Sequence, residues 1–444
     1  MSGIAEILLC NGFRVSGSDM SSGPICDRLQ SLGATIFTGH STEHLPSEAS
    51  LVVYSSAVPL SNPEVMAAKS RGIPVVKRAE VLAELMRLKF GVGVAGSHGK
   101  TTTTTIVGWI LNHAELDPTI IVGGQVQSFG SGGRAGKSSF LVAEADESDR
   151  SFLLLKPTIA VVTNVDREHL SAYRDEGDLR ESFEQFVRSV PFYGLAVLCI
   201  DDPFLEDLAK RYERRKVTYG FSEAADVRGE VHGVTSKGVE FSVFVKGQKL
   251  FTSLLPMAGR HFAKNALAAV AVALEFGIAS EKIAEALTSC PGVARRLECI
   301  GECDGALIYS DYGHHPVEIA ATLSALDESY RQAGRRLRVV FQPHRYSRTV
   351  ECFDQFLTAF VQCDELIVTE IYSAGESPIA EVSGELLASA IQGGCASYAS
   401  TLEDAGKKLI ETFSPEDVIL FLGAGSIGKY SHQFFDSLKS SSSY

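Results

Sequence analysis

Short apolar runs rich in β-branched residues recur along the chain, and most are followed by a glycine-containing turn and an amphipathic segment. This alternation predicts strands followed by helices, the pattern of α/β domains with parallel sheets. The strands are expected at 51–54, 73–76, 91–96, 139–143, 159–163, 196–200, 306–309, 337–341, 365–368 and 418–422. Between 227 and 254, apolar and polar residues alternate around glycine turns, which is typical of antiparallel strands.

The chain opens on a predicted helix at 4–9, which stops near Asn11 and Gly12, and a strand is predicted next at 13–17. A doubly wound domain normally opens on a strand and a glycine-rich turn. We therefore expect a Rossmann-like N-terminal domain whose first strand is absent from this chain. With 444 residues, the chain is long enough for about three domains.

Composition limits the classes of function. Hydrophobic residues make up 45% of the chain and charged residues 21%, as in folded globular proteins. Asp and Glu number 54 against 41 Lys and Arg, and the net charge of −13 disfavours non-specific binding to nucleic acid. Nine scattered cysteines predict reduced thiols and a cytoplasmic location rather than a disulfide framework. The sequence has no apolar run near the ~18 residues of a membrane span, so membrane insertion is not expected.

A glycine-rich segment with a lysine and a threonine lies between the predicted strand at 91–96 and a predicted helix. Its residues are Gly96, Ser97, His98, Gly99, Lys100, Thr101 and Thr102. Backbone N–H groups at such a turn bind phosphate, the lysine contacts the terminal phosphates and the threonine hydroxyl holds Mg²⁺. Val94 stands where the usual P-loop has a glycine, so the segment is a shortened variant. The alternatives are a glycine turn with a solvated lysine, or a GTPase, although Val165 stands where a guanine-reading motif has lysine.

Two further loops follow predicted strands of the same region. Glu144 opens an acidic loop, Glu-Ala-Asp-Glu-Ser-Asp, directly after the strand at 139–143. Its carboxylates lie where α/β sheets bind ligands, and their oxygens suit Mg²⁺. His169 comes after the strand at 159–163 and is able to face the same cleft. Taken alone, a solvated acidic loop and a surface histidine are the alternatives.

Two motifs in the last quarter of the chain have competing interpretations. Arg345 and Arg348 lie three residues apart after the strand at 337–341, which fits either a functional anion site or a solvated basic turn. Gly423, Gly425 and Gly428 match a dinucleotide fingerprint, but 16 residues follow Gly428. A further strand with a ribose-binding acid has no room there, so we interpret these glycines as a tight strand–helix turn.

Together these motifs resemble those of the Mur ligases, and in particular the alanine-adding type. The resemblance spans essentially the whole chain, with motifs in order at 96–102, 144–149, 164–169, 259–265, 311–316 and 342–349. Asp-Tyr-Gly-His-His-Pro at 311–316 and Gln-Pro-His-Arg-Tyr-Ser-Arg-Thr at 342–349 are the most specific. It implies three α/β domains: a Rossmann-like UDP-sugar-binding domain at 1–88, a central P-loop ATPase domain at 89–292 and a Rossmann-like amino-acid domain at 293–444.

The resemblance also implies a reaction, in peptidoglycan precursor synthesis. ATP phosphorylates the lactyl carboxylate of UDP-N-acetylmuramate, the amine of L-alanine attacks the acyl phosphate, and an amide and phosphate are released. Two negative groups 4 Å apart repel by ~4 kcal/mol at an effective dielectric of 20. Lys100 and Mg²⁺ are expected to offset this repulsion. We expect the protein to act as a monomer or a dimer.

The family match assigns residues to the nucleotide and the metal. Thr101 and Glu144 would hold one Mg²⁺, and His169 a second. Asn265 would hold adenine, and Arg296 would contact ATP. The residues expected to carry catalysis are Lys100, Glu144, His169, Asp311, Arg345 and Arg348.

The match assigns the other two substrates as well. Arg345 and Arg348 would clamp the carboxylate of L-alanine and the intermediate. Tyr312 and His314 would line that pocket. The residues expected to contact the UDP-sugar are Asp19, His40, Ser55 and Ser56.

The sequence departs from the family pattern at a few positions. Phe262 replaces a usual asparagine, Ser171 a frequent aspartate and Ser97 a threonine. Between Lys156 and Lys210 there is no lysine, which fits the alanine-adding type because related ligases carry a carbamylated lysine there. Two alternatives stay open at this point: a related ligase that recycles a tripeptide onto the UDP-sugar, and a binding or regulatory relic with a truncated first domain.

Overall fold

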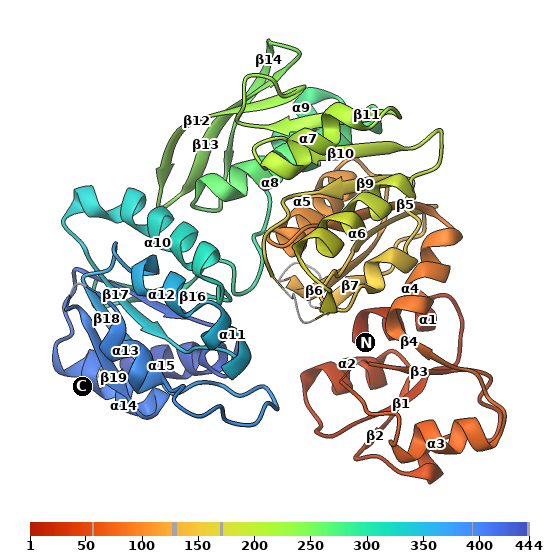
Figure 1. Cartoon of the computed structure of the whole chain (residues 1–444), viewed down its shortest axis with the longest axis horizontal. Helices are drawn as coiled ribbons and strands as arrows, with labels where there is room; N and C mark the ends of the chain where they lie inside the picture. Colours follow the sequence, from red (N-terminus) through yellow and green to blue (C-terminus); the bar gives the residue numbers. More distant parts are fainter. Residues whose placement is uncertain (56, 127–130, 169–171, 393, 442–444) are drawn as a thin grey trace. The chain divides into compact units, whose positions relative to one another are not determined.

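The computed structural model describes residues 1–55, 57–126, 131–168, 172–392 and 394–441 (Figure 1). The chain divides into two compact units. Unit 1 comprises Met1–Glu230, Ser242–Ser253 and Lys264–Pro291, and unit 2 comprises Val231–Phe241, Leu254–Ala263 and Gly292–Tyr444. The expected domain limits near residues 88 and 292 stay a prediction. Within the described part of the chain, no helix combines the length and apolar character needed to cross a membrane.

The N-terminal part of unit 1 contains two separate two-stranded parallel sheets, β1–β2 and β3–β4. Its elements are α1 (Ser2–Cys10), β1 (Ser16–Asp19), α2 (Pro24–Ser31), β2 (Thr35–Thr38), η1 (Thr42–His44), β3 (Val52–Tyr54), α3 (Pro63–Ser70), β4 (Val75–Lys77) and α4 (Arg78–Arg87). The helix expected at 4–9 is confirmed by α1. The strand expected at 13–17 is wrong in its bounds, because pairing with β2 begins only at Ser16 and Phe13 is exposed.

A ten-stranded sheet follows, in the order β14-β13-β12-β11-β10-β9-β5-β8-β6-β7. Most of it belongs to unit 1, but β12, β13, β14 and helix α8 have residues in both units. The strands from β12 to β6 pair in parallel, and β7 joins β6 antiparallel. The strands are β5 (Phe90–Ala95), β6 (Thr119–Val126), β7 (Ser131–Arg134), β8 (Phe140–Glu144), β9 (Ile159–Val162), β10 (Leu195–Cys199), β11 (Lys216–Gly220), β12 (Val227–Thr235), β13 (Gly238–Val245) and β14 (Gln248–Leu255). The helices are α5 (Lys100–His113), η3 (Ser151–Leu154), α6 (Glu176–Arg188), α7 (Pro203–Arg211), α8 (Arg260–Glu275) and α9 (Ser280–Thr288).

The strand β5 occupies a central place in this sheet, between β8 and β9. Val92, Val94 and Ala95 are fully buried, as a strand covered on both faces requires. A side chain at Gly93 would meet Pro157 and Phe186 at 3.1–3.2 Å, so the glycine permits close packing there. Because parallel strands end at the same edge, the loops after β5, β8 and β9 meet at the carboxyl edge of the sheet.

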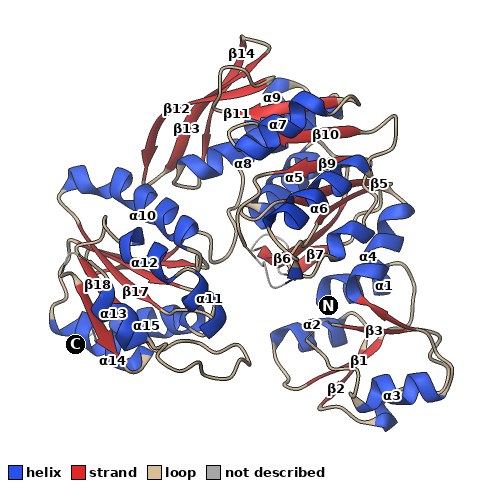
Figure 2. Cartoon of the chain, viewed as in Figure 1, coloured by secondary structure: helices blue, strands red, loops and turns tan. Residues whose placement is uncertain are grey.

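Unit 2 is built on a six-stranded sheet in the order β15-β16-β20-β17-β18-β19, parallel except for the β15 edge (Figure 2). The strands are β15 (Glu298–Cys303), β16 (Ala306–Asp311), β17 (Arg336–Phe341), β18 (Glu365–Thr369), β19 (Ala396–Ala399) and β20 (Asp417–Leu422). The helices are α10 (Pro316–Tyr330), η5 (Arg331–Ala333), α11 (Tyr346–Glu351), α12 (Phe353–Ala359), α13 (Gly384–Ala390), α14 (Leu402–Glu411) and α15 (Ile427–Ser441).

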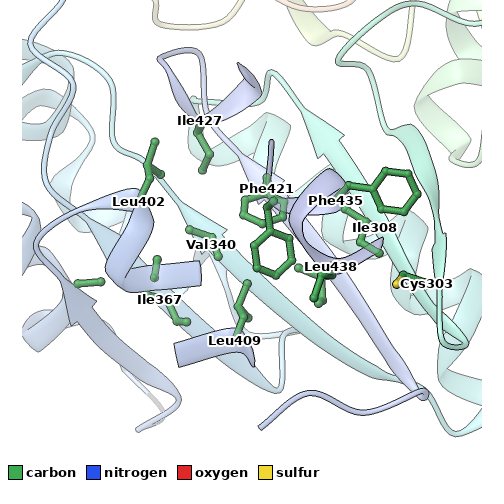
Figure 3. Packing of buried hydrophobic residues seen from close by; sticks show 14 residues of the cluster. Cys303, Ile308, Val340, Ile367, Leu402, Leu409, Phe421, Ile427, Phe435 and Leu438 are labelled. Atoms are coloured by element: carbon green, nitrogen blue, oxygen red, sulfur yellow. The ribbon is translucent and has the colours of Figure 1, made fainter. Parts of the chain in front are cut away.

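Apolar side chains from this sheet and from α14 and α15 form a buried core (Figure 3). Phe421 of β20, Val340 of β17 and Ile367 of β18 are fully buried in it. A charged pair is also buried: the Arg338 guanidinium lies 2.9 Å from the buried Asp417 carboxylate and 2.7 Å from Glu365. Such a buried cation needs partners, because desolvation without them is costly.

Candidate functional site

The loop after β5 has the backbone geometry of a phosphate-binding turn. Gly96 has φ +140° and Gly99 has φ +81°, conformations that side chains disfavour. A Cβ on Gly96 would lie 1.9 Å from the hydroxyl of Thr163, and one on Gly99 would lie 2.6 Å from the amide oxygen of Asn265. Both positions are therefore restricted to glycine by conformation and by space. The helix α5 begins at Lys100, so the free N–H groups of its first turn lie at the loop.

Hydrogen bonds to the segment after β9 hold this loop in place. The His98 N–H donates to the Asn164 side chain at 2.8 Å, and the Asn164 amide donates back to the His98 carbonyl at 3.1 Å. The Thr163 hydroxyl donates to the same carbonyl at 2.6 Å. The Asp166 N–H donates to the Ser97 hydroxyl at 2.8 Å. A loop fixed at this many points is preorganised to receive a ligand.

Lys100 is folded back onto the loop. Its ammonium donates to the carbonyls of Gly96 at 2.7 Å and Ser97 at 3.0 Å, and to the Glu147 carboxylate at 2.9 Å. Burial alone would lower the pKa of Lys100, but the neighbouring carboxylates, Glu147 foremost, raise it above its usual value. The lysine therefore stays charged, as a group that contacts phosphate must.

Thr101 and Glu144 bring oxygen atoms together beside the loop. The Thr101 hydroxyl donates to the Glu144 carboxylate at 2.9 Å, and the same carboxylate oxygen accepts the Gly123 N–H at 2.7 Å. A hydroxyl and a carboxylate at the start of a phosphate-loop helix are hard oxygen donors, which fits Mg²⁺ held together with substrate phosphates. His169, the expected ligand of a second ion, lies outside the described residues.

The other residues expected to bind ATP fall in both units. Thr102 is buried in the first turn of α5, and Asn265 of α8 lies against Gly99 of the loop. Arg296 belongs to unit 2, where its guanidinium lies 5.2 Å from the centre of the Tyr312 ring and 3.7 Å from the Glu318 carboxylate. The loop and Asn265 thus come together within unit 1.

A cavity of about 380 Å³ lies between the N-terminal part of unit 1 and the β6–β7 region. Ser55 is in its wall, together with Arg28 and Arg78, two cations that the sequence interpretation did not single out. Asp19 and His40 are not among its lining residues. The His40 ring instead lies 2.9 Å from the Ser18 hydroxyl, which donates to Glu64. Ser56 lies outside the described residues.

In unit 2, the segments after β16, β17, β18 and β20 also meet at the carboxyl edge of the sheet. Asp311, the last residue of β16, is buried and accepts the N–H groups of Leu297 at 2.6 Å and Gly313 at 2.7 Å. Burial raises the pKa of the Asp311 carboxyl. Its two backbone bonds make Asp311 an anchor for the Tyr312–His314 turn.

The two expected clamp residues lie beside an aromatic pair. His344 stacks on Tyr372 with ring centres 5.5 Å apart, and the Arg348 guanidinium lies 3.4 Å from the His344 ring. Arg345 has φ +72°, and its side chain is half exposed, 3.9 Å from the Glu376 carboxylate. Burial and the positive charges of Arg348 and Arg345 lower the pKa of His344 to about 4.

Tyr312 and His314 face the same group of rings. The His314 ring lies 5.4 Å from the Tyr312 ring and 5.9 Å from the His344 ring, centre to centre. Burial lowers the pKa of His314 to about 3, with Arg348 contributing. The structure therefore brings Tyr312 and Arg348 together with two neutral histidines, His314 and His344. This arrangement offers positive charge to a carboxylate and flat apolar surface to a small side chain.

Sequence reasoning missed several residues of these sites. Glu147 was grouped with a general acidic loop, and nothing in its spacing distinguishes it from its neighbours. His344 was available from the motif at 342–349, where it stands next to Arg345. Tyr372 and Glu376 come from the loop after β18, a segment with no motif, so only the fold places them beside the arginines.

Comparison with known proteins agrees with this geometry. Three family models match: the Mur ligase family catalytic domain at residues 1–90, the Mur ligase middle domain at 94–273 and the Mur ligase glutamate ligase domain at 295–425. A UDP-N-acetylmuramate–L-alanine ligase of Geobacter sp. (strain M21) is 48% identical over 430 residues, which are 96% of this chain and 93% of the relative.

Solved structures show the same likeness over the whole chain. The UDP-N-acetylmuramate-alanine ligase MurC of Thermotoga maritima is similar with a TM-score of 0.85 at 28% identity, over 99% of this chain and 97% of that one. A murein peptide ligase of Psychrobacter arcticus is similar with a TM-score of 0.72 at 25% identity, over 99% and 96%. With its sequence matched from residue 1 to residue 425, this chain belongs to the Mur ligase family.

Proposed function

We propose that this chain is a UDP-N-acetylmuramate–L-alanine ligase, which uses ATP to join L-alanine to the lactyl carboxylate of UDP-N-acetylmuramate. The observation that carries the proposal is the near full-length identity with relatives of that name, in a chain that has both a lysine-bearing phosphate loop and an arginine-rich carboxyl edge. The reaction belongs to peptidoglycan precursor synthesis, and we place it in the cytoplasm, as a step that cell growth and division require.

In the first step, the lactyl carboxylate attacks the γ-phosphorus of ATP, and ADP leaves with the bridging oxygen. Negative charge on both reactants opposes this approach. Lys100, with its raised pKa, supplies a permanent positive charge to the terminal phosphates. The N–H groups of the loop and of the first turn of α5 bind the remaining phosphate oxygens. A Mg²⁺ held by Thr101 and Glu144 would add positive charge at the same oxygens.

In the second step, the amine of L-alanine attacks the acyl phosphate, and the tetrahedral intermediate collapses to the amide and inorganic phosphate. Arg345 and Arg348 bind the carboxylate of alanine, because a guanidinium matches a carboxylate in charge and geometry. Tyr312 and His314 line the space for its methyl group. Asp311 acts on this pocket through the backbone turn that it anchors.

The test is phosphate release by the full chain. We expect release only when UDP-N-acetylmuramate, L-alanine, ATP and Mg²⁺ are all present, and its loss in Lys100→Ala. Release without either acceptor would identify a plain ATPase instead. A panel of L-alanine, glycine, L-serine and a tripeptide would identify the acceptor, and preference for the tripeptide would overturn the alanine assignment in favour of the recycling ligase. Isothermal titration with UDP-N-acetylmuramate tests the relic hypothesis, which a failure to bind would support.

A further inference from the structure

The ammonium group of Lys100 has three N–H donors, and each has a protein acceptor. Two are the carbonyls of Gly96 and Ser97, and the third is the carboxylate of Glu147. The carboxylate lies within 2.8 Å of the lysine nitrogen. To reach a phosphate, the lysine must give up at least one of these bonds. Of the three acceptors, only the Glu147 carboxylate carries a negative charge, so a phosphate is the natural substitute for it as the partner of the lysine.

Glu147 is held in a way that fixes this contact. It comes from the loop after β8, and its side chain is 1% exposed. Its backbone carbonyl accepts a hydrogen bond from the buried hydroxyl of Tyr173 at 2.6 Å. The Arg150 guanidinium covers the Tyr173 ring, 5.0 Å from its centre. The backbone is thus anchored on one side while the carboxylate points to the lysine.

A phosphate and the Glu147 carboxylate are competing partners for one lysine. Both are anions, and a phosphate at hydrogen-bond distance from the lysine would lie close to the buried carboxylate. Repulsion between two such charges is strong where water is excluded. Burial raises the pKa of Glu147 to about 7 even though Lys100 lowers it, so this buried position tolerates the negative charge of the carboxylate poorly. Glu144 and Asp146 add further negative charge around Lys100.

We propose that Glu147 is a positioning residue that holds Lys100 in the nucleotide-free loop and is displaced from it when a phosphate of the nucleotide binds. The inference rests on the proposed function, because it assumes that this loop binds the nucleotide. The carboxylate keeps the lysine side chain ordered between turnovers. The exchange of partners costs binding free energy, so Glu147 weakens nucleotide affinity and favours release of ADP.

The experiment is isothermal titration of the full chain with ADP, with Mg²⁺ and with EDTA in its place. Glu147→Gln keeps the shape and one acceptor but removes the charge. We expect it to bind ADP about tenfold more tightly than the wild type, with the larger gain in EDTA, where no metal screens the phosphates. Glu281→Gln on the exposed face of α9 makes the same change in net charge and is expected to leave affinity unchanged.

Unchanged or weaker ADP binding by a folded Glu147→Gln protein overturns the inference, since a purely structural role predicts one of these results. Thermal unfolding verifies the fold, and Glu147→Met, of similar length and without charge, is expected to tighten binding in the same direction. Stopped-flow measurement of ADP release is expected to show slower dissociation in both variants. If the wild type does not bind ADP at all, the proposed function fails as well. If the acceptor panel shows a preference for an acceptor other than L-alanine but ADP binding behaves as expected, the inference about Glu147 stands.

Discussion

The two carboxyl-edge sites of this protein handle charge in opposite ways. In unit 1, the ammonium of Lys100 is surrounded by carboxylates and is satisfied by Glu147 before any ligand binds. In unit 2, arginines surround two histidine rings that burial and those arginines keep neutral. The arginines that contribute are Arg295, Arg296, Arg345 and Arg348.

This difference follows from the ligands proposed for each site. A polyphosphate is expected to arrive together with a metal ion, so its site can place carboxylates around a lysine. The carboxylate of an amino acid brings a single negative charge and no metal, so its site keeps an excess of positive charge ready. Lysine suits the first task as a mobile point charge, and arginine suits the second as a rigid two-pronged donor.

The largest effect is expected from removing the cation of the phosphate loop. Lys100→Ala should lower the rate of phosphate release about 10³-fold or more, because charge developing on the transferred phosphoryl group loses its main protein cation. Steady-state kinetics with all three substrates measure this. The control is Lys89→Ala. Lys89 lies outside the loop and donates to Thr119 and Ser138, so its loss should keep the rate within a few-fold of the wild-type rate. Equal losses in both variants would contradict a specific role for Lys100.

The next largest effect is expected from unit 2. Arg348→Ala should reduce kcat/KM for L-alanine about 10²-fold and leave the KM for ATP nearly unchanged, since loss of a charged partner costs a carboxylate several kcal/mol. Arg348→Lys should recover only part of the loss, because an ammonium lacks the two-pronged geometry. A parallel rise in both KM values would show that the two sites are not separate in function.

A smaller effect is expected from changing Thr101, whose hydroxyl lies beside the Glu144 carboxylate. Thr101→Val should raise the Mg²⁺ concentration needed for half-maximal activity about tenfold, because it replaces a hydroxyl ligand with a methyl group of the same shape. Thr101→Ser keeps the hydroxyl and should restore the wild-type requirement. Titration of activity with Mg²⁺ at saturating ATP measures both. An unchanged requirement in Thr101→Val would exclude this hydroxyl as a ligand.

The smallest effect is expected in the pH dependence of stability. The pKa of His344 is about 4 in the folded protein and ~6.5 in an unfolded chain, so between these values only the unfolded chain binds the proton. The contribution of His344 to stability is therefore complete above about pH 6.5 and declines as the pH falls toward 4. Urea unfolding at pH 7, 5.5 and 4.5 should show a smaller decline for His344→Gln than for the wild type. Equal declines in the stability of the two proteins would show that a group other than His344 causes the pH dependence.

Much of the architecture could be predicted from local pattern. The α/β class is confirmed by the likeness to the Thermotoga maritima structure. The apolar runs at 337–341 and 418–422 correspond to β17 and β20, because strands buried on both faces leave a continuous apolar signal. The phosphate loop was recognisable because glycine, lysine and threonine at fixed spacing follow from the geometry of a strand–turn–helix. The interpretation of Gly423 as a strand–helix turn agrees with its place between β20 and α15.

Where the signal depends on a distant partner, prediction from the sequence was weaker. The pairing of β1 with β2 set a start at Ser16 that the apolar pattern around Phe13 did not indicate. Short elements such as β7, whose sequence is Ser-Gly-Gly-Arg, carry too little hydrophobic signal to be expected. The expected UDP-sugar contacts show the same limit, because Ser55 reaches the cavity wall whereas His40 is bound to Ser18.

Local patterns were sufficient to indicate the type of chemistry: a loop with glycine, lysine and threonine, an acidic loop and a pair of arginines, each after a strand, in the order of the Mur ligases. These signals are local, since a turn, a helix start and a charged pair need only neighbouring residues. Which charged groups come into contact depends on the tertiary structure. It paired Lys100 with Glu147 and placed His344 against Tyr372, because loops far apart in the chain converge where parallel strands end.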